Sequence, residues 1–240
     1  MTAAEIKFVS SLSQKKFRDI SGLFTVEGEK MVAEALGSGF EVVSLWRREE
    51  IGEKAMSRIS SLSSPSPVLA VVRKPAAGML SVPEKGLWLA LDGISDPGNM
   101  GTILRIADWF GIDGVFASED STDIYSPKVV QATMGAIFRV KFQYTGIPDL
   151  CSKLLAAGGK VYGTFLDGDD IYEKELSDGT SSPALIVIGN ESRGISKETA
   201  ACVSDRLFIP PYPRDLSGSE SLNAAVATAV TVAEFRRRQH

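Results

Sequence analysis

The feature that most constrains the fold is a regular alternation of apolar, strand-like segments with helix-like segments over residues 87–237. Leu185-Ile186-Val187-Ile188 is the continuous apolar run expected of a strand that is buried on both faces. Strands that alternate with helices predict a parallel sheet with helices on both faces, so this region is predicted to be α/β. We expect strands at 87–91, 114–117, 138–143, 160–165, 184–188 and 206–209, and helices at 99–110, 127–135, 147–157, 196–202 and 221–237.

A smaller α/β unit is predicted before this region, over residues 1–75. Its elements are expected to be helices at 5–20, 29–36 and 51–60, and strands at 24–26, 42–46 and 67–72. The segment from Arg73 to Gly86 carries Pro75, Gly78, Pro83 and Gly86, and residues 76–86 are interpreted as a linker. The expected domains are therefore 1–75, the linker 76–86, and 87–240.

The composition excludes several classes of chemistry. His240 is the only histidine, so a histidine-based catalytic triad and a histidine-rich metal site are excluded, and we expect no metal. Cys151 and Cys202 do not form a disulfide framework, which favours a reducing, cytoplasmic location. No run of 18 apolar residues exists and lysines interrupt the first 25 residues, so neither a membrane partner nor a signal peptide is expected.

Charge is unevenly distributed along the chain, whose formal net charge is −4. Residues 1–80 hold 11 Lys and Arg against 9 Asp and Glu, a net +2, and the remainder hold 15 against 21, a net −6. Proteins that bind nucleic acid are usually more basic, so a polyanionic partner would have to meet local patches. The segment Lys15-Lys16-Phe17-Arg18 is a candidate patch, and a solvated helix face is the alternative interpretation.

The first candidate site segment runs from Leu91 to Arg105. A predicted strand ends there, a turn rich in Asp, Pro and Gly follows, and a helix begins near Asn99. Glycines allow backbone to approach a ligand, and a helix N-terminus offers unpaired N–H groups. No G-x-G-x-x-G pattern is present, so a dinucleotide site has no support. A plain turn with Arg105 as a surface charge is an equally acceptable interpretation.

Two further segments carry polar residues at the end of a predicted strand or at the start of a predicted helix, where ligand sites are common. Gly189-Asn190-Glu191-Ser192-Arg193-Gly194 follows the most apolar strand, at the end where open α/β sheets bind ligands. Ser221 and Asn223 stand at the start of an alanine- and valine-rich helix that is too apolar for a surface helix. By itself, the second of these segments favours a helix cap followed by a core helix.

Together the three segments resemble, in the right order, the signature motifs of the SpoU/TrmH family of RNA ribose 2′-O-methyltransferases, within the SPOUT superfamily. The resemblance is strong over 87–238 and weaker over 1–75, which is similar to the L30e-like substrate-binding domain of many members. Residues 211–220 depart from the family because the segment before Ser221 is longer than expected. The matching pieces are Asp96-Pro97-x-Asn99-x-Gly101-x-x-x-Arg105, Gly189-Asn190-Glu191-x-x-Gly194, and Ile209-Pro210 with Ser221-Leu222-Asn223.

The resemblance implies a SPOUT-type parallel sheet whose C-terminal segment forms a deep trefoil knot, preceded by an L30e-like domain. It also implies S-adenosyl-L-methionine as cofactor, RNA as substrate and a homodimer as the working form. The residues that it assigns to cofactor binding are Thr164, Gly189, Asn190, Gly194, Ile209 and Leu222. Those that it assigns to catalysis are Asn99, Arg105, Glu191, Ser221 and Asn223.

The expected roles follow the chemistry of methyl transfer, which needs a ribose hydroxyl held in line with the donor. Guanidinium stays protonated, so Arg105 is expected to bind a phosphate next to the target rather than accept a proton. Asn99 is expected to orient Arg105, while Glu191, Ser221 and Asn223 complete a polar wall.

The function predicted from the sequence is methyl transfer to a ribose 2′-hydroxyl of structured RNA, with ribosomal RNA preferred over transfer RNA. Two alternatives remain open. One is a catalytically inactive RNA-binding protein of the same fold, and the other is a nucleotide-binding α/β enzyme of another class. The intact motif residues count against the first, and the missing glycine-rich nucleotide motifs count against the second.

Overall fold

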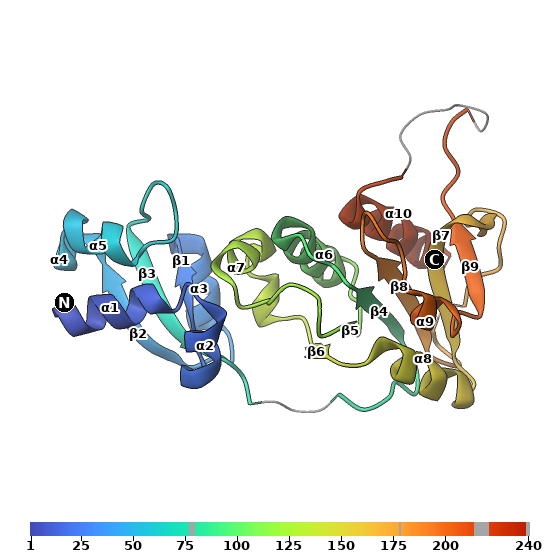
Figure 1. Cartoon of the computed structure of the whole chain (residues 1–240), viewed down its shortest axis with the longest axis horizontal. Helices are drawn as coiled ribbons and strands as arrows, with labels where there is room; N and C mark the ends of the chain where they lie inside the picture. Colours follow the sequence, from blue (N-terminus) through green and yellow to red (C-terminus); the bar gives the residue numbers. More distant parts are fainter. Residues whose placement is uncertain (77–79, 178, 214–220, 239–240) are drawn as a thin grey trace. The chain divides into compact units, whose positions relative to one another are not determined.

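The computed structural model describes residues 1–76, 80–177, 179–213 and 221–238, and the chain divides into two compact units (Figure 1). The first comprises Met1–Gly78 and Asp123–Arg139, and the second comprises Met79–Thr122 and Val140–His240. The segment 123–139 therefore belongs to the first unit although it lies within the sequence of the second. The expected domain boundaries did not include this return segment, because local sequence patterns do not reveal which core a helix joins.

The first unit is built on a three-stranded antiparallel sheet in the order β1-β3-β2. Alternate residues of its central strand enter different cores. Val68, Ala70 and Val72 pack with α3 and α7, whereas Leu69 and Val71 pack with α1 and α5. The elements are α1 (Ala3–Ser11), α2 (Lys15–Ser21), β1 (Leu23–Glu27), α3 (Glu29–Gly37), β2 (Val42–Arg47), α4 (Arg48–Ile51), α5 (Glu53–Ile59), β3 (Val68–Arg73), α7 (Pro127–Thr133) and the 3-10 helix η1 (Ala136–Phe138).

The single helix expected at 5–20 is in fact two helices, α1 and α2, so that prediction was wrong. The turn between them is rich in serine. The Ser11 hydroxyl donates to the carbonyl of Phe8 at 2.6 Å, and the Ser13 hydroxyl donates to that of Ser10 at 2.8 Å. Serine side chains that bond to nearby backbone carbonyls compete with helical hydrogen bonds and favour a turn.

Arg18 of α2 is buried, with 2% of its surface exposed. Its Nη2 and Nε lie 2.6 and 3.1 Å from Oδ2 of Asp123, and its Nη1 donates to the carbonyls of Leu12 and Ser13, each at 2.8 Å. A buried guanidinium with this many partners is unavailable to a phosphate. Arg18 therefore does not contribute to the RNA-binding patch considered for residues 15–18.

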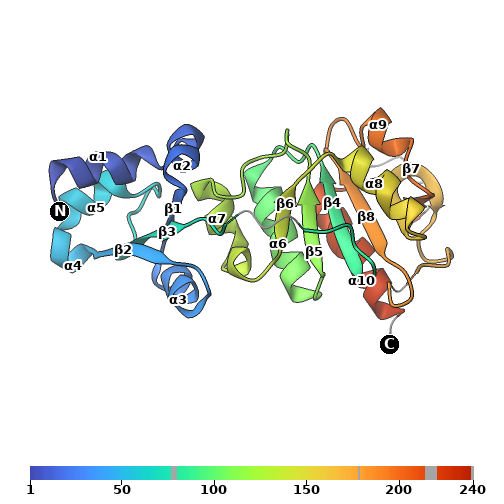
Figure 2. The same cartoon turned by 90° about the horizontal axis from the view of Figure 1, so that it is seen from below.

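The second unit contains a six-stranded sheet in the order β6-β5-β4-β8-β7-β9, in which every pair is parallel (Figure 2). The predicted parallel α/β sheet is confirmed. Its elements are β4 (Leu87–Asp92), α6 (Pro97–Trp109), β5 (Gly114–Ala117), β6 (Phe142–Tyr144), α8 (Ile147–Ala156), β7 (Lys160–Asp170), β8 (Ala184–Gly189), α9 (Lys197–Ala200), β9 (Asp205–Phe208) and α10 (Ala224–Arg237).

Helices cover both faces of this sheet, with α8 and α9 on one face and α6 and α10 on the other (Figure 2). Leu185 and Val187 of β8 pack in one cluster with Leu150 of α8. On the opposite face, the ring of Tyr162 in β7 meets Phe235 of α10 edge-on, with centroids 5.0 Å apart. Burial on both faces explains why β8 is apolar at every position rather than at every second one.

The strand expected at 138–143 is β6, which begins four residues later and ends one residue later than expected, and the short helix η1 precedes it. Met134 and Gly135 both adopt left-handed backbone, with φ of 51° and 98°. These two residues end α7 and turn the chain, so the apolar residues that follow them form η1 before the sheet is reached.

We predict that Asp123→Ala lowers the free energy of unfolding by about 3 kcal/mol or more, because it leaves the buried Arg18 charge without its counter-ion. Urea denaturation followed by circular dichroism measures this loss. Asp149→Ala is the matched control. Its partner is Lys153, both side chains are more than half exposed, and the expected loss is about 0.5 kcal/mol or less. Equal losses in the two variants would contradict the role given to Arg18.

Candidate active site

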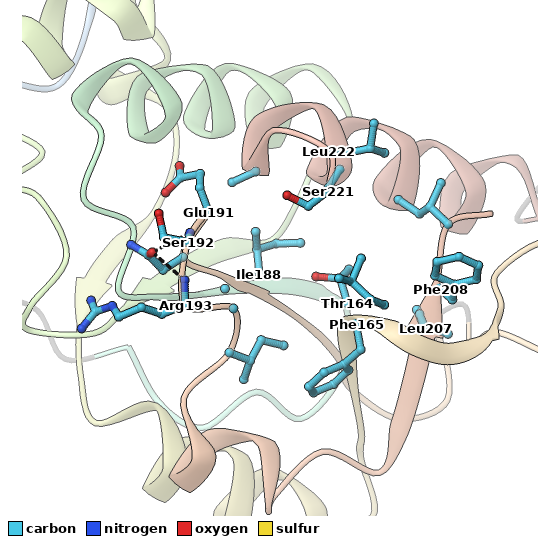
Figure 3. Close-up of a pocket in the computed structure, with 18 residues that line it drawn as sticks. Thr164, Phe165, Ile188, Glu191, Ser192, Arg193, Leu207, Phe208, Ser221 and Leu222 are labelled. Carbon is cyan, nitrogen blue, oxygen red and sulfur yellow. Dashed lines mark hydrogen bonds between the residues drawn. The ribbon is translucent and has the colours of Figure 1, made fainter. Parts of the chain in front are cut away.

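A cleft of about 450 Å³ opens at the carboxyl ends of β7, β8 and β9. Figure 3 shows that its two ends differ, because Phe165 and Phe208 lie at one end and Glu191 and Arg193 at the other. A small molecule with an apolar part and a charged part matches such a division. The lining residues are Thr164, Phe165, Leu166, Ile188, Gly189, Asn190, Glu191, Ser192, Arg193, Gly194, Ile195, Leu207, Phe208, Ile209, Ser221, Leu222, Ala224 and Ala227.

Asn190 holds the loop after β8 in one conformation. Its backbone N–H donates to the Gly194 carbonyl at 3.0 Å, and the Gly194 N–H donates back at 2.8 Å. Its side-chain oxygen accepts from the N–H groups of Ser192 and Arg193, and its amide donates to the Gly93 carbonyl at 2.8 Å. The loop is thereby tied both to itself and to the end of β4.

Glycine is required at the two ends of this loop for different structural reasons. A Cβ on Gly189 would stand closer than van der Waals contact to backbone atoms of Gly194 and Ile195. Gly194 instead has a φ of +67°, which side-chain-bearing residues rarely adopt. At these two positions the wall of the cleft therefore carries no side chain.

A network of three side chains lies at the polar end of the cleft. The Asn99 amide donates to Glu191, and the Asn99 carbonyl oxygen accepts from the Asn223 amide at 2.9 Å. Asn223 also caps α10, because its side-chain oxygen accepts from the N–H of Ala225 at 3.0 Å, and Asp96 caps α6 in the same way. Two helix N-termini, with their positive partial charges, therefore converge near the Glu191 carboxylate.

The strand β7 carries a bulge that forms the apolar end of the cleft. Thr164 and Asp169 both pair with Leu207 of β9, so residues 165–168 loop out between them. A Cβ on Gly168 would lie 2.7 Å from the backbone carbonyl carbon of Leu207, which explains the glycine. The expected strand 160–165 is correspondingly longer than predicted and ends at Asp170.

Residues of this bulge were missed by the sequence analysis. Phe165 and Leu166 line the cleft, and the guanidinium of Arg206 stacks on the Phe165 ring with its carbon 3.5 Å from the centroid. Arg206 also forms an ion pair with Asp167. The signal that could have revealed the bulge is Gly168 inside a strand-like segment, because glycine in a strand often marks a bulge.

The structure brings most of the predicted site residues to one place. Glu191 and Ser221 line the cleft, and Asn99 and Asn223 join Glu191 through hydrogen bonds. All the residues expected to bind the cofactor line the same cleft, namely Thr164, Gly189, Asn190, Gly194, Ile209 and Leu222. Their individual functions stay predictions, as does the effect of the longer segment 211–220, of which residues 214–220 lie outside the described residues.

Arg105 lies apart from this group. It is exposed on α6, does not line the cleft, and makes no hydrogen bond or ion pair within the described part of the chain. The expected contact by which Asn99 would orient Arg105 is not formed, since the Asn99 side chain bonds to Glu191 and Asn223 instead. Among the described residues, only the position of Arg105 on α6 therefore determines where its guanidinium lies.

Other chemistries find little support among the described residues. They contain no cluster of His, Cys, Asp and Glu side chains arranged to hold a metal ion. Nor do the described ranges include a helix of the length and apolarity that crossing a bilayer requires. Burial raises the pKa of the Cys151 thiol to about 12, so at neutral pH it is protonated and is a poor nucleophile.

Comparisons with known proteins agree with this architecture. The SpoU rRNA Methylase family matches residues 86–233, and the MRM3-like substrate binding domain matches residues 3–74. The 23S rRNA (guanosine(2553)-2′-O)-methyltransferase RlmP of Bacillus subtilis is 29% identical, over 97% of this chain and 96% of its own.

Solved structures give the same result. A TrmH-family protein from Porphyromonas gingivalis is 41% identical and covers 99% of each chain, with a TM-score of 0.89. An AdoMet-bound rRNA methyltransferase from Sinorhizobium meliloti is 30% identical and covers 100% of this chain and 97% of its own, with a TM-score of 0.87.

The chain belongs to the SpoU rRNA methylase family. The family and the enzyme class predicted from the three motifs are thereby confirmed, together with a substrate-binding domain at the N-terminus. S-adenosylmethionine, the predicted cofactor, is present in the structure of the Sinorhizobium meliloti neighbour.

We predict that Gly189→Ser lowers the melting temperature by several degrees, because the added Cβ forces the backbone of residues 194–195 away at a cost of about 1–3 kcal/mol. Differential scanning calorimetry measures the change. Gly146→Ser is the matched control, since a Cβ there meets nothing within 4 Å and serine is a good cap for α8. A Gly189→Ser variant as stable as the control would show that the loop is not tightly packed.

Proposed function

We propose that this chain transfers a methyl group from S-adenosylmethionine to a ribose 2′-hydroxyl of ribosomal RNA. The observation that carries the proposal is the convergence of the six expected cofactor-binding residues on one cleft whose polar end holds Asn99, Glu191 and Asn223. The Bacillus subtilis relative is named as a 2′-O-methyltransferase of 23S rRNA, which supports ribosomal RNA as the substrate class.

The cleft has the features that this methyl donor requires. Gly189 and Gly194 add no side chain to the wall, so main-chain N–H and C=O groups at these two positions could meet the edge of the adenine. Ile209 and Leu222 would contribute to this adenine end, and Thr164 lines the same cleft. When bound, the donor supplies an electrophilic methyl group on a positively charged sulfur.

The polar end of the cleft provides what the acceptor needs. A ribose hydroxyl gains the methyl group and releases its proton, so its oxygen must be held in line and its O–H must have an acceptor. The Glu191 carboxylate, held by Asn99, can accept that hydrogen bond. Ser221, which lines the cleft, can hold the neighbouring ribose oxygen.

Arg105 is suited to binding RNA. Its guanidinium is exposed on α6, the helix that also carries Asn99, and has no protein partner among the described residues. A planar guanidinium forms two parallel hydrogen bonds with a phosphate. We therefore assign Arg105 to the phosphate next to the target ribose, which would fix the orientation of the hydroxyl.

The larger organisation is part of the same proposal. Residues 1–75 would select the RNA, 76–86 would be the linker, and 87–240 would carry out the transfer with the C-terminal segment in a trefoil knot. Support for the knot is that α10 packs on α6 and β8, in the interior of the sheet, although it follows the edge strand β9. Trp109, 85% exposed on α6, and Val226, 48% exposed on the adjacent α10, support a homodimer through these helices.

We predict that titration calorimetry gives micromolar affinity for S-adenosylmethionine and no binding of NAD, because no glycine-rich dinucleotide loop is present. Transfer of a labelled methyl group to unmodified 23S rRNA, located by primer extension, then tests the reaction. Donor binding without transfer to RNA would favour a binding protein of the same fold. Binding of NAD instead would refute the proposed function.

We predict that Arg105→Ala abolishes methyl transfer while the affinity for the donor stays within a few-fold, because Arg105 lies outside the cleft. Arg105→Lys keeps the charge but loses the bidentate geometry, and we expect intermediate turnover. Single-turnover methylation and donor calorimetry on the same preparations separate the two effects. Near-normal turnover of Arg105→Ala would remove this residue from the mechanism.

A further inference from the structure

Arg193 is the single cation among the described residues that line the cleft. Its side chain is 71% exposed, and its Nη2 lies 3.7 Å from Oδ2 of Asp120. That separation is longer than a hydrogen bond, so the pair is held by charge alone. The guanidinium thus carries a full charge with its hydrogen-bond donors still available.

The backbone of Arg193 is, by contrast, firmly held. Its N–H donates to the side-chain oxygen of Asn190 at 3.1 Å, within the loop that the paired backbone groups of Asn190 and Gly194 close. A fixed turn therefore presents a free guanidinium. Such an arrangement suits the binding of an anionic ligand, because the backbone is already ordered and little conformational entropy is lost when the ligand binds.

The position of the Arg193 guanidinium also favours ligand binding. Nη2 of Arg193 lies 3.3 Å from the point where a Cβ of Gly93 would stand, directly after β4. β4 and β8 are neighbours, and the strand order reverses between them, since β5 and β6 lie on one side and β7 and β9 on the other. Open α/β sheets bind ligands outside the carboxyl ends of strands at such a point.

Arg193 points away from the apolar end of the cleft. In Figure 3, it lies beyond Glu191 and Ser192, on the side opposite Phe165 and Leu207. A contact that Arg193 makes would therefore be with the acceptor, whose reacting oxygen approaches Glu191, and not with the apolar part of the donor.

Asp120 is built to hold Arg193 loosely. One of its oxygens accepts from the Ser118 hydroxyl at 2.6 Å, which anchors the carboxylate, and the other faces the guanidinium. Ser118 in turn accepts from the Gly93 N–H at 2.8 Å. Following the guanidinium outward would cost the carboxylate its hydrogen bond to Ser118, so an incoming anion can compete with Asp120 for Arg193.

We propose that Arg193 binds an RNA phosphate at the mouth of the active site, and that Asp120 is the counter-charge that this phosphate displaces. The inference rests on the proposed function, which supplies the RNA. A guanidinium is the side chain best matched to phosphate oxygens. Residues 81–240 carry a net −6, so a local cation is needed where the RNA backbone reaches the cleft.

The test uses the full chain and an in-vitro-transcribed 23S rRNA as probe, with filter binding between about 50 and 200 mM salt. We expect Arg193→Ala to weaken RNA binding about tenfold and to reduce the slope of log affinity against log salt by about 0.7–0.9. The Kd for S-adenosylmethionine, measured by calorimetry, stays unchanged, and Arg193→Lys recovers part of the RNA affinity.

Lys197→Ala is the matched control for the lost charge. Lys197 is exposed at the start of α9, four residues further along, and does not line the cleft. Its removal should change RNA affinity by no more than about twofold. An equal loss in the two variants would overturn the inference, because the effect would then be one of net charge.

The second arm tests Asp120. We expect Asp120→Asn to tighten RNA binding about two- to threefold, and this gain to vanish in the Arg193→Ala background. Asp149→Asn, which removes a similarly exposed carboxylate on α8, controls for general repulsion. A purely structural role of Asp120 would weaken binding or leave it unchanged, and either result would overturn the proposed competition.

Failure of the inference is distinguishable from failure of the proposed function. Arg193→Ala that weakens donor binding and leaves RNA binding intact would assign the guanidinium to the donor and overturn the inference alone. A wild-type chain that binds the donor but no RNA would overturn both the inference and the substrate class. A wild-type chain that binds RNA but not the donor would refute methyl transfer and leave the Arg193 result valid.

Discussion

The active site depends on one hydrogen-bonded junction, in which the Asn99 side chain joins α6, the loop after β8 and the start of α10. These segments are far apart in the sequence, and no main-chain hydrogen bond among the described residues links the three. An amide is suited to the position because it donates to the Glu191 carboxylate and accepts from Asn223 at the same time. A carboxylate at position 99 would repel Glu191, and an apolar side chain would remove the hydrogen bonds that Glu191 and the Asn223 amide make to Asn99.

The rest of the cleft is shaped by irregularities of the backbone as well as by the side chains that line it. Parallel strands bring their carboxyl ends to one edge, but the depth of the cleft comes from two irregularities at that edge. One is the closed turn between Asn190 and Gly194, and the other is the bulge of β7 at 165–168. Each irregularity contains or adjoins a glycine that packs against backbone, so the position of the wall is insensitive to side-chain mobility.

Much of this arrangement could be predicted from the sequence, and the limits have physical causes. The parallel sheet follows from local periodicity, and the motifs identify most of the cleft because loops at strand ends must lie together. The bulge of β7 arises from pairing with β9 some forty residues later, which local patterns do not contain. The burial of Arg18 depends on Asp123, a partner contributed by a segment that the sequence assigns to the other domain.

Net charge is a poor guide to how such a chain meets RNA, because several cations of the first unit already form ion pairs within the protein. Arg18 is neutralised by Asp123, Lys74 by Asp19 and Arg73 by Glu41. These internal pairs offset part of the positive charge that residues 1–80 contain. By contrast, the acidic second unit keeps two arginines exposed, namely Arg193 at its cleft and Arg105 on α6. Recognition by a few well-placed guanidinium groups, rather than by a broad basic surface, is consistent with an acidic protein that acts on a polyanion.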